Sequence, residues 1–576
     1  MDIKIIGGNK NATITYKERR EGEIIYIDFS LTLPTPEIPE KTTLRFSFPN
    51  FSAYSFFDST YFLVSRNLRP NWSPKKTEAR LAAGIPLQGY VSADGKNDFT
   101  LAISDVMTPT EITSGCYEGS KGEVAGEFDL RVSFFTLPIA ALESYSATIR
   151  IDTRRIPFYD ALYDITEWWE KDCGYTPAFV PEAAKNAVNS LWYSYHQEIK
   201  LDKILEECRI QKEWGLDTVI LDDGWQTEDE NRGYAYCGDW EVAPSKIPDM
   251  KAFADELHKL GMKFMLWFSV PYVGIHSKAY EKFKTMVLDF EPGKWFCLDP
   301  RYKEVRDYLC EIYVNAAQNW GLDGFKLDFI DSFVLQGKSL EPDDRRDYTS
   351  LEDAVDALLS EVYEKLTAIN PDMLLEFRQN YIGPAVRKYG NMLRVGDCPC
   401  DALKNRYDII NLRLTSGKTP IHSDMIMWDY KQPAEYAALQ ISNVLFGVPQ
   451  VSVRANELKP DHVEMLKFYL SFWKEHRDIL LDGKLIPHNP EAMYSIVSSE
   501  LSGKAVFALY TDNIVCGEYS YLAVVNSSRK DHFYLENSVG KGYKTYNCQG
   551  ELLDSGNITE RMQKIALPLS GIAIVE

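Results

Sequence analysis

The chain has 576 residues, of which 45% are hydrophobic and 26% charged, and its 84 acidic and 63 basic residues give a formal net charge of −21. This composition supports a large folded core and excludes a disordered chain, a collagen-like fibre and a small disulfide-stapled fold. The negative charge repels phosphates, and no stretch of about 18 apolar residues occurs, so we expect neither a nucleic-acid nor a membrane partner.

Cysteine usage and the start of the chain bear on the compartment. Ten cysteines are scattered without metal-ligand spacing, and the opening MDIKIIGGNK lacks a basic segment followed by an apolar one. We therefore expect no signal peptide, reduced thiols and a cytoplasmic protein. We expect no metal and no cofactor, and the sequence leaves the oligomeric state open, a homo-oligomer included.

The first region, residues 1–157, has the alternation of β-strands. Runs at 25–33, 128–134 and 149–151 each keep one apolar face, and turns such as Asp94-Gly95 separate such runs. Several alternating strands with this punctuation predict an N-terminal β-sandwich.

The middle region, residues 158–482, alternates short apolar strands with helical patterns. Residues 201–208, 253–260, 305–316 and 355–366 carry apolar residues at helical spacing. Eight strands are predicted at 190–193, 218–221, 263–267, 324–328, 373–376, 392–394, 420–422 and 448–451. Eight such units predict a central (β/α)₈ TIM barrel.

The last region, residues 483–576, returns to short strands at 505–510, 521–525 and 571–575, which predict a small all-β domain. The fold class is therefore multidomain α/β, with a barrel between two β-domains.

Charged side chains gather at the predicted carboxyl ends of the barrel strands, which line the active face of such a barrel. An aspartate at a strand end can also cap the next helix, but a cap does not need basic residues beside it. The acids are Asp222, Asp223, Asp328, Glu376, Asp397 and Asp424; Lys326, Arg378, Arg394 and His422 stand beside them, with Trp225 and Trp267.

An acidic barrel mouth lined by aromatic rings fits sugar chemistry. Glycoside hydrolysis needs two carboxyl groups, one to protonate the leaving oxygen and one to act as nucleophile or base. A metal site is the competing use of the same carboxylates, but of eight histidines only His422 lies at a strand end. The sequence therefore favours a glycosidase over a metal hydrolase.

Four motifs in order resemble glycoside hydrolase family 36, the retaining α-galactosidases related to family 27. They are Leu221-Asp-Asp-Gly-Trp225, Gly238-Asp-Trp240, Leu266-Trp-Phe268 and Lys326-Leu-Asp328. The resemblance covers residues 190–430 and agrees with a sandwich, a barrel and a C-terminal β-domain.

The resemblance implies that Asp328 is the nucleophile. Lys326 lies two residues earlier on the same strand face, where its charge lowers the pKa of Asp328. Asp331 is the local rival; it lies beyond the strand end, where we expect it to cap the segment that follows.

The resemblance also places an acid/base carboxyl after Arg394, and Asp397 fits that place. In relatives the spacing is often one residue longer, which here falls on Cys398, a poor proton donor. Asp401 is the alternative, and we expect it to be the N-cap of the next helix.

Further resemblance assigns substrate contacts. Asp222 and Asp223 match the pair that holds galactose O4 and O6, while Trp225 and Trp267 would stack on the pyranose. At the fifth strand end, Glu376 and Arg378 stand where relatives recognise O2, although the Gly/Cys-rich motif of the family is absent there. Lys326 and Arg394 complete the predicted site; Asp424 and His422 lack counterparts and are expected to support it.

These residues predict an exo-acting retaining α-galactosidase that releases terminal α-linked galactose through a covalent galactosyl–Asp328. Three alternatives remain: an α-N-acetylgalactosaminidase, a galactosyl-transferring enzyme similar to raffinose synthase, and a catalytically silent carbohydrate-binding protein. The sequence does not fix the substrate or the linkage.

Overall fold

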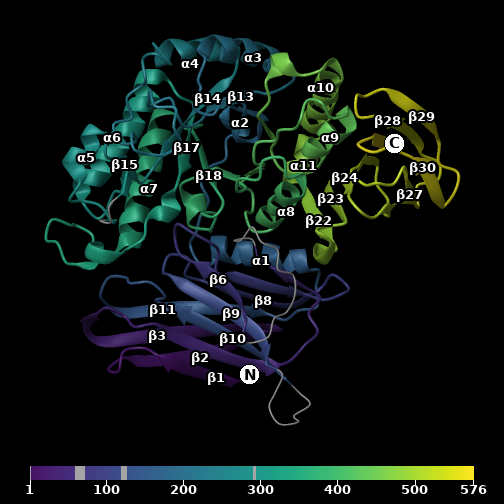
Figure 1. The fold of residues 1–576 in the computed structure, drawn as a ribbon. Coiled ribbons are helices and arrows are strands. Elements are labelled where there is room, and N and C mark those ends of the chain that lie inside the picture. Colours follow the sequence, from purple (N-terminus) through teal and green to yellow (C-terminus); the bar gives the residue numbers. More distant parts are fainter. Residues whose placement is uncertain (1, 59–71, 118–125, 290–292) are drawn as a thin grey trace.

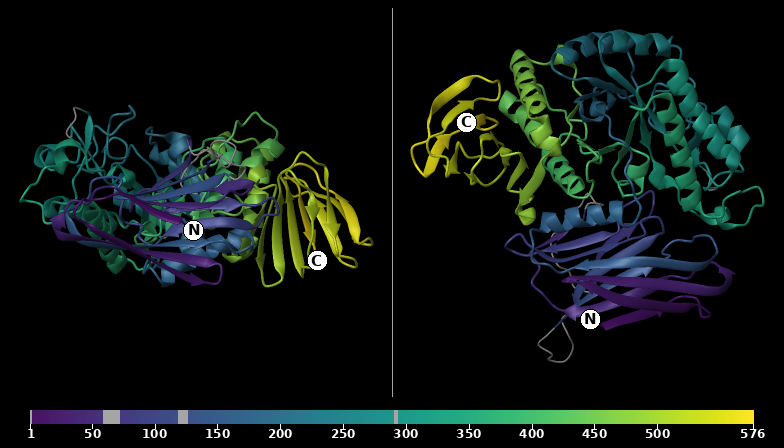
Figure 2. Two further views of the ribbon diagram at one scale, coloured as in Figure 1. Left: turned by 90° about the horizontal axis from the view of Figure 1, so that it is seen from below. Right: turned by 180° about the vertical axis from the view of Figure 1, so that it is seen from behind.

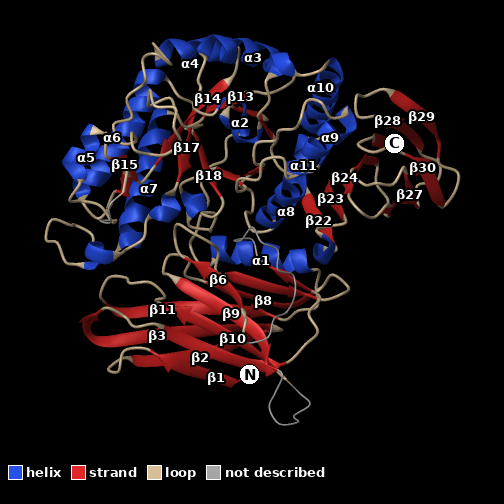
Figure 3. Cartoon of the chain, viewed as in Figure 1, coloured by secondary structure: helices blue, strands red, loops and turns tan. Residues whose placement is uncertain are grey.

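Three regions follow one another along the chain (Figure 1). The computed structural model describes residues 2–58, 72–117, 126–289 and 293–576. Strands make up the first and last regions, and strands alternate with helices in the middle one (Figure 3). No helix among these residues is both long and apolar enough to cross a membrane.

The N-terminal region is a sandwich of two antiparallel sheets. One sheet has the order β1 (Asp2–Gly7), β4 (Thr42–Pro49), β10 (Glu127–Phe134), β9 (Thr110–Tyr117) and β6 (Lys75–Ala79). The other has the order β2 (Thr13–Glu21), β3 (Ile24–Glu37), β11 (Leu142–Asp152), β8 (Asn97–Ile103), β7 (Leu87–Val91) and β5 (Ser55–Phe57). The predicted apolar faces meet between them: Phe29 of β3 stacks on Phe134 of β10 with ring centroids 4.8 Å apart.

The middle region contains one parallel eight-stranded sheet. Its order is β20 (Ile421–His422), β19 (Met392–Arg394), β18 (Leu374–Arg378), β17 (Gly324–Asp328), β14 (Lys263–Ser269), β13 (Thr218–Leu221), β12 (Val188–Ser190) and β21 (Gln450–Val451). Parallel bridges from His422 to Val448 and from Ile426 to Val451 join its two ends. The predicted barrel is confirmed.

One barrel strand was misplaced by the sequence analysis. The first strand is β12, two residues earlier than the predicted 190–193, and Trp192–Tyr195 form the short helix α2. The reason is register: Val188 pairs with Thr218 and with Gln450, so the strand ends at Ser190. The aromatic residues that follow lie outside the sheet and form α2.

Helices surround the barrel sheet. The predicted stripe of α7 is confirmed, with Val355, Leu358 and Val362 all buried. The helices are α1 (Phe158–Lys171), α3 (Leu201–Glu213), α4 (Met250–Lys259), α5 (Lys278–Phe283), α6 (Lys303–Trp320), α7 (Leu351–Ile369), α8 (Ala402–Arg413), α9 (Ala434–Ser442), α10 (Pro460–Glu475) and α11 (Arg477–Asp482). A small hairpin of β15 (Tyr272–Gly274) and β16 (Trp295–Cys297) follows β14.

The C-terminal region has two sheets. The larger has the order β22 (Lys484–His488), β23 (Ile496–Leu501), β24 (Lys504–Leu509), β26 (Tyr521–Asn526), β31 (Ile572–Val575), β28 (Gly542–Tyr546) and β29 (Leu552–Asn557). The smaller has β25 (Ile514–Val515), β27 (His532–Glu536) and β30 (Met562–Ala566). Figure 2 shows these strands beside the barrel, where Tyr469 of α10 donates to the carbonyl of Ser570 at 2.7 Å.

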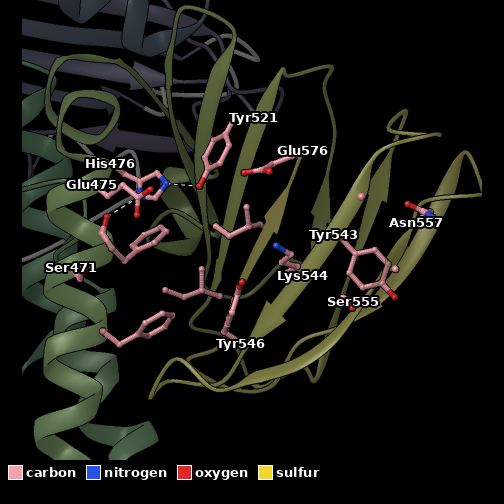
Figure 4. A pocket seen from close by; sticks show the side chains of 16 residues that line it. Ser471, Glu475, His476, Tyr521, Tyr543, Lys544, Tyr546, Ser555, Asn557 and Glu576 are labelled. Carbon is pink, nitrogen blue, oxygen red and sulfur yellow. Dashed lines mark hydrogen bonds between the residues drawn. The ribbon is translucent and has the colours of Figure 1, made fainter.

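A cavity of 760 Å³ lies between α10 and the larger C-terminal sheet (Figure 4). Phe468 and Tyr546 line it, and the His476 ring nitrogen lies 2.5 Å from the Tyr521 hydroxyl at one side. None of the strand-end carboxylates of the barrel lines this cavity.

The sandwich contacts the barrel at the loops that follow two of its strands. Arg80 donates to the carbonyls of Asp331 at 2.6 Å and Phe333 at 3.0 Å, both after β17. The backbone N–H of Gly84 donates to the carbonyl of Asn380, after β18, at 2.7 Å. The N-terminal region therefore supports the carboxyl end of the barrel sheet.

Candidate active site

The predicted site residues come together because parallel barrel strands end on one face. Asp222 and Asp223 follow β13, Asp328 ends β17 and Arg394 ends β19. Register places Trp267 beside Lys326, Lys326 beside Glu376, and Arg378 beside Arg394 on neighbouring strands. The sequence thus delivers charged side chains from four strands, and Trp267 from a fifth, to one end of the barrel.

Asp328 lies at the centre of this cluster and is 7% exposed. Its Oδ1 accepts from Arg378 Nε at 2.7 Å, from the Phe329 backbone N–H at 3.0 Å and from the Tyr381 hydroxyl. Its Oδ2 accepts from Trp267 Nε1 at 3.1 Å. All of these donors favour the charged carboxylate.

The charge state of Asp328 follows from these neighbours. Burial alone would raise its pKa, but the cations Arg378 and Lys326, with the Tyr381 and Trp267 hydrogen bonds, hold the pKa well below its usual range. The predicted effect of Lys326 is confirmed. A buried carboxylate that stays ionised at neutral pH is what a nucleophile requires.

Lys326 itself binds Asp222. Its Nζ lies 2.6 Å from Asp222 Oδ2, and both side chains are buried. The other oxygen of Asp222 accepts the backbone N–H of Asp223 at 2.9 Å. Lys326 therefore acts on Asp328 through its charge, while its hydrogen bond orients Asp222.

Asp223 is held by two amides. Gln197 Nε2 donates to one carboxylate oxygen at 2.8 Å and Gln226 Nε2 to the other at 2.7 Å. Burial raises the pKa of Asp223 to about 6, because these neutral donors only partly replace water. The turn that follows the two aspartates needs Gly224, whose φ is +115° and whose added Cβ would lie 2.7 Å from Gln197 Cα.

The two predicted tryptophan platforms differ. Trp225 is fully buried, donates to the carbonyl of Trp267 at 2.8 Å, and packs its ring against Trp240 and Phe268. It has no free face for a sugar, so the predicted contact of Trp225 is wrong and its place is in the supporting wall. Trp267 is also buried, at 2% exposed, but it does lie in the cluster, because its indole N–H donates to Asp328.

Arg394 links three carboxylates. Its guanidinium lies 2.6 Å from Asp424, 2.9 Å from Asp397 and 3.8 Å from Glu376. Asp424 is fully buried, and burial raises its pKa against the opposing effect of Arg394. It also accepts the Cys398 backbone N–H at 2.6 Å. Asp424 thus supports the segment that carries Asp397.

Asp397 differs from Asp424 in being exposed. The protein groups around Asp397 still displace some water, which by itself would raise its pKa. The charges of Arg394, then Arg378 and Lys326, outweigh this effect and hold the pKa below its usual value. Its rival Asp401 accepts the Lys404 backbone N–H at 2.9 Å and caps α8, as predicted.

Asp331, the rival to Asp328, lies in the 3₁₀ turn Ile330–Ser332, which has no side-chain cap. Asp331 therefore lies inside the turn that follows β17 and not at its N-cap, which is Phe329.

Glu376 and His422 lie deeper in the barrel. Glu376 is fully buried and accepts from Gln450 Nε2 at 2.5 Å, and burial raises its pKa. The buried ring of His422 lies 2.8 Å from the carbonyl of Ala184, and burial lowers its pKa to about 4, so it is neutral. The predicted sugar contact of Glu376 is wrong, since neither of its oxygens is exposed. Both residues belong to a polar layer beneath the site.

Several contacts were missed by sequence reasoning. Tyr381 donates to Asp328, Tyr193 donates to Asp424 at 3.0 Å, and Gln197 and Gln226 hold Asp223. Tyr381 and Gln226 could have been found from the sequence, because each lies three residues after a predicted site residue, Arg378 and Asp223 respectively. Tyr193 and Gln197 follow the first barrel strand, which the sequence misplaced.

Comparison with known proteins shows what the barrel is similar to. The sequence model of the melibiase family matches residues 182–379. The α-galactosidase Mel36A of Lactobacillus acidophilus is 32% identical over 149 residues, covering 24% of this chain and 19% of the relative. The α-galactosidase AgaA of Geobacillus stearothermophilus is 27% identical over 194 residues, covering 32% and 26%. An A type blood α-D-galactosamine galactosaminidase of Flavonifractor plautii is 30% identical over 135 residues, covering 20% and 12%. The matches span about a quarter or less of these relatives' lengths.

Solved structures show the same architecture over the whole chain. The family 36 α-galactosidase AgaA from Geobacillus stearothermophilus, in complex with raffinose, has a TM-score of 0.66 at 16% identity and covers 98% of this chain and 81% of that one. An α-galactosidase from Lactobacillus brevis has a TM-score of 0.65 at 14% identity, covering 100% and 85%. At these identities the likeness shows the fold. Together with the melibiase match, it confirms the resemblance to glycoside hydrolase family 36.

Proposed function

We propose that this chain, whose residues 182–379 belong to the melibiase family, is a retaining α-galactosidase that removes terminal α-linked galactose. The observation that carries this proposal is the Asp328 carboxylate. It is buried at a strand end and kept ionised by two cations, with a second carboxylate, Asp397, three residues after the end of β19. A nucleophile and a proton donor on one barrel face are the parts that a retaining glycosidase needs.

The mechanism has two displacements. Asp328 attacks the anomeric carbon while Asp397 gives a proton to the departing oxygen, and Asp397 then accepts a proton from the water that releases the sugar. Because Arg394 lowers the pKa of Asp397, the first step requires substrate to loosen this 2.9 Å ion pair. The same ion pair favours the carboxylate form that the second step uses.

Specificity for galactose rests on the far end of the site. Asp222 and Asp223 would accept hydrogen bonds from O4 and O6, which are charge-assisted and about twice as strong as neutral ones. A glucoside would leave such an acceptor unpaired. Trp267 would form a wall beside the reacting carbon, and Arg378 would face O2.

A second candidate is an α-N-acetylgalactosaminidase. The fifth strand end carries Arg378 and Tyr381 in place of the family's Gly/Cys-rich motif, which changes the surface that a C2 substituent would meet. One relative, from Flavonifractor plautii, is named for galactosamine. The two candidates differ only in which C2 group fits.

Aryl α-glycosides of galactose, N-acetylgalactosamine and glucose, tested side by side, distinguish these functions. We expect the galactoside to be hydrolysed with the highest kcat/KM and the glucoside to be a poor substrate. We further expect Asp328→Asn to lose activity by several powers of ten, and Asp328→Gly with azide to give β-galactosyl azide. Comparable rates on the glucoside and the galactoside, or clear residual activity in Asp328→Asn, would contradict the proposal.

A further inference from the structure

The two oxygens of the Asp328 carboxylate have unequal surroundings. Oδ1 accepts three hydrogen bonds, from the Arg378 guanidinium, the Tyr381 hydroxyl and the Phe329 backbone N–H. Within the part of the chain that the structure describes, Oδ2 accepts one, from Trp267 Nε1, at the longer distance of 3.1 Å. Negative charge is therefore drawn toward Oδ1, and the lone pairs of Oδ2 are less engaged.

The donors on Oδ1 are fixed in place. Tyr381 is fully buried, and burial raises its pKa well above the usual range, so the hydroxyl keeps the proton it donates. That hydroxyl also accepts the Phe329 backbone N–H at 2.9 Å. Arg378 is fixed by a second hydrogen bond from Nη1 to the carbonyl of Gln379 at 2.8 Å.

Resting on the proposed retaining mechanism, we propose that Oδ2 attacks the anomeric carbon and that Tyr381 and Arg378 are positioning residues that set how readily the carboxylate leaves in the second step. In the first step the Oδ2–C1 bond forms, the bond from C1 to the aglycone oxygen breaks, and that oxygen takes the proton of Asp397. Asp328 becomes a neutral ester, with Oδ1 as its carbonyl oxygen.

The second step returns the charge to the same donors. A water oxygen bonds to C1 and loses its proton to Asp397, while the C1–Oδ2 bond breaks and its electron pair restores the Asp328 carboxylate. Arg378, Tyr381 and the Phe329 N–H bind the charge that redevelops on Oδ1. Preorganised donors aimed at developing charge lower such a barrier.

These donors stabilise the anion more than the ester, which fixes the sign of their effect. Removing one makes Asp328 a stronger nucleophile and a poorer leaving group. Formation of the galactosyl-enzyme is then retained while its hydrolysis slows, so the covalent intermediate accumulates. A residue that merely supports the fold would slow both steps.

Tyr381→Phe tests this with an aryl α-galactoside that has a good leaving group. A hydrogen bond to a charged group corresponds to roughly a tenfold to hundredfold effect on rate, and we expect kcat to fall by that factor while kcat/KM changes less than about threefold. Intact-mass measurement should show the hexosyl adduct during turnover, with a pre-steady-state burst of released aglycone. Tyr389→Phe is the matched control, a buried tyrosine eight residues later whose hydroxyl donates to Asp356 instead.

Arg378→Met is measured in parallel, so the result does not depend on the folding of one variant. Because Arg378 would also face O2, we expect its kcat/KM to fall as well, and the signature of the proposal in this variant is the accumulating adduct. Equal losses in kcat and kcat/KM without an adduct in either variant would overturn the proposal. Wild-type protein inactive on all three aryl α-glycosides would instead reject the proposed function.

Discussion

Asp223 should set the acidic limb of the pH profile. Burial between two neutral amides raises its pKa from 3.8 to about 6. If the ionised form holds the sugar hydroxyl, about nine-tenths of the protein carries a protonated Asp223 at pH 5, and kcat/KM there should be about one-tenth of its plateau. The plateau should be reached above pH 7. This limb belongs to the free enzyme, because kcat/KM reports free-enzyme ionisations.

The same shift predicts a stability cost. A carboxyl whose pKa is higher in the folded than in the unfolded state favours folding when protonated, so its ionisation destabilises the fold. A rise from 3.8 to about 6 corresponds to about 3 kcal/mol, fully present above pH 6 and relieved as the pH falls toward 3.8. Asp223→Asn should therefore be more stable than wild type at pH 7, by up to that amount.

Two measurements test this reasoning. The kcat/KM of an activated aryl α-galactoside is followed from about pH 4.5 to 8, since such a substrate needs little protonation by Asp397. Thermal unfolding of wild type and Asp223→Asn is compared at pH 7. An acidic limb that Asp223→Asn retains unchanged, or a clearly less stable variant, would refute the account.

The remaining predictions concern the other carboxylates. Asp397→Ala should slow substrates with poor leaving groups far more than activated aryl glycosides; if Asp401→Ala shows that dependence instead, the acid/base is misassigned. Lys326→Met should lower the free energy of unfolding by about 3–5 kcal/mol, because it leaves Asp222 buried and unpaired, and denaturant unfolding would measure the loss. A loss below about 1 kcal/mol would mean that Asp222 finds another partner.

The barrel was predictable because its signals are local. Short apolar strands and helical stripes each occupy one stretch of sequence. Seven of the eight predicted strands share two or more residues with the observed ones, and the first shares only Ser190. The first strand failed because its end is set by pairing with β13 and β21, at Val188 and Asn189, which no single stretch reveals. The strand-end carboxylates were also predictable, because each lies at or shortly after the end of a predicted strand in the sequence.

Depth and direction of side chains were not predictable. Trp225 follows β13 and Trp267 lies in β14, yet only the Trp267 indole donates to Asp328, because the Trp225 indole donates to the carbonyl of Trp267 instead. Glu376 pairs with Lys326 and lies two residues before the end of β18. Its side chain is therefore buried beneath the residues at the strand end. Sequence spacing predicts on which face of a strand a side chain lies. Whether that side chain is exposed depends on the other residues that pack over it.

Charge states in this site depend on residues far apart in the chain. Tyr381 and Phe329 bind Asp328 from loops that Arg80 and Gly84 of the sandwich hold by hydrogen bonds to the carbonyls of nearby residues. The strand end supplies the Asp328 carboxylate. The loops supply hydrogen-bond donors that help to keep it ionised and that bind Oδ1 rather than Oδ2. Because the sandwich holds those loops, it belongs physically to the site even though none of its described side chains reaches Asp328 by a hydrogen bond or an ion pair.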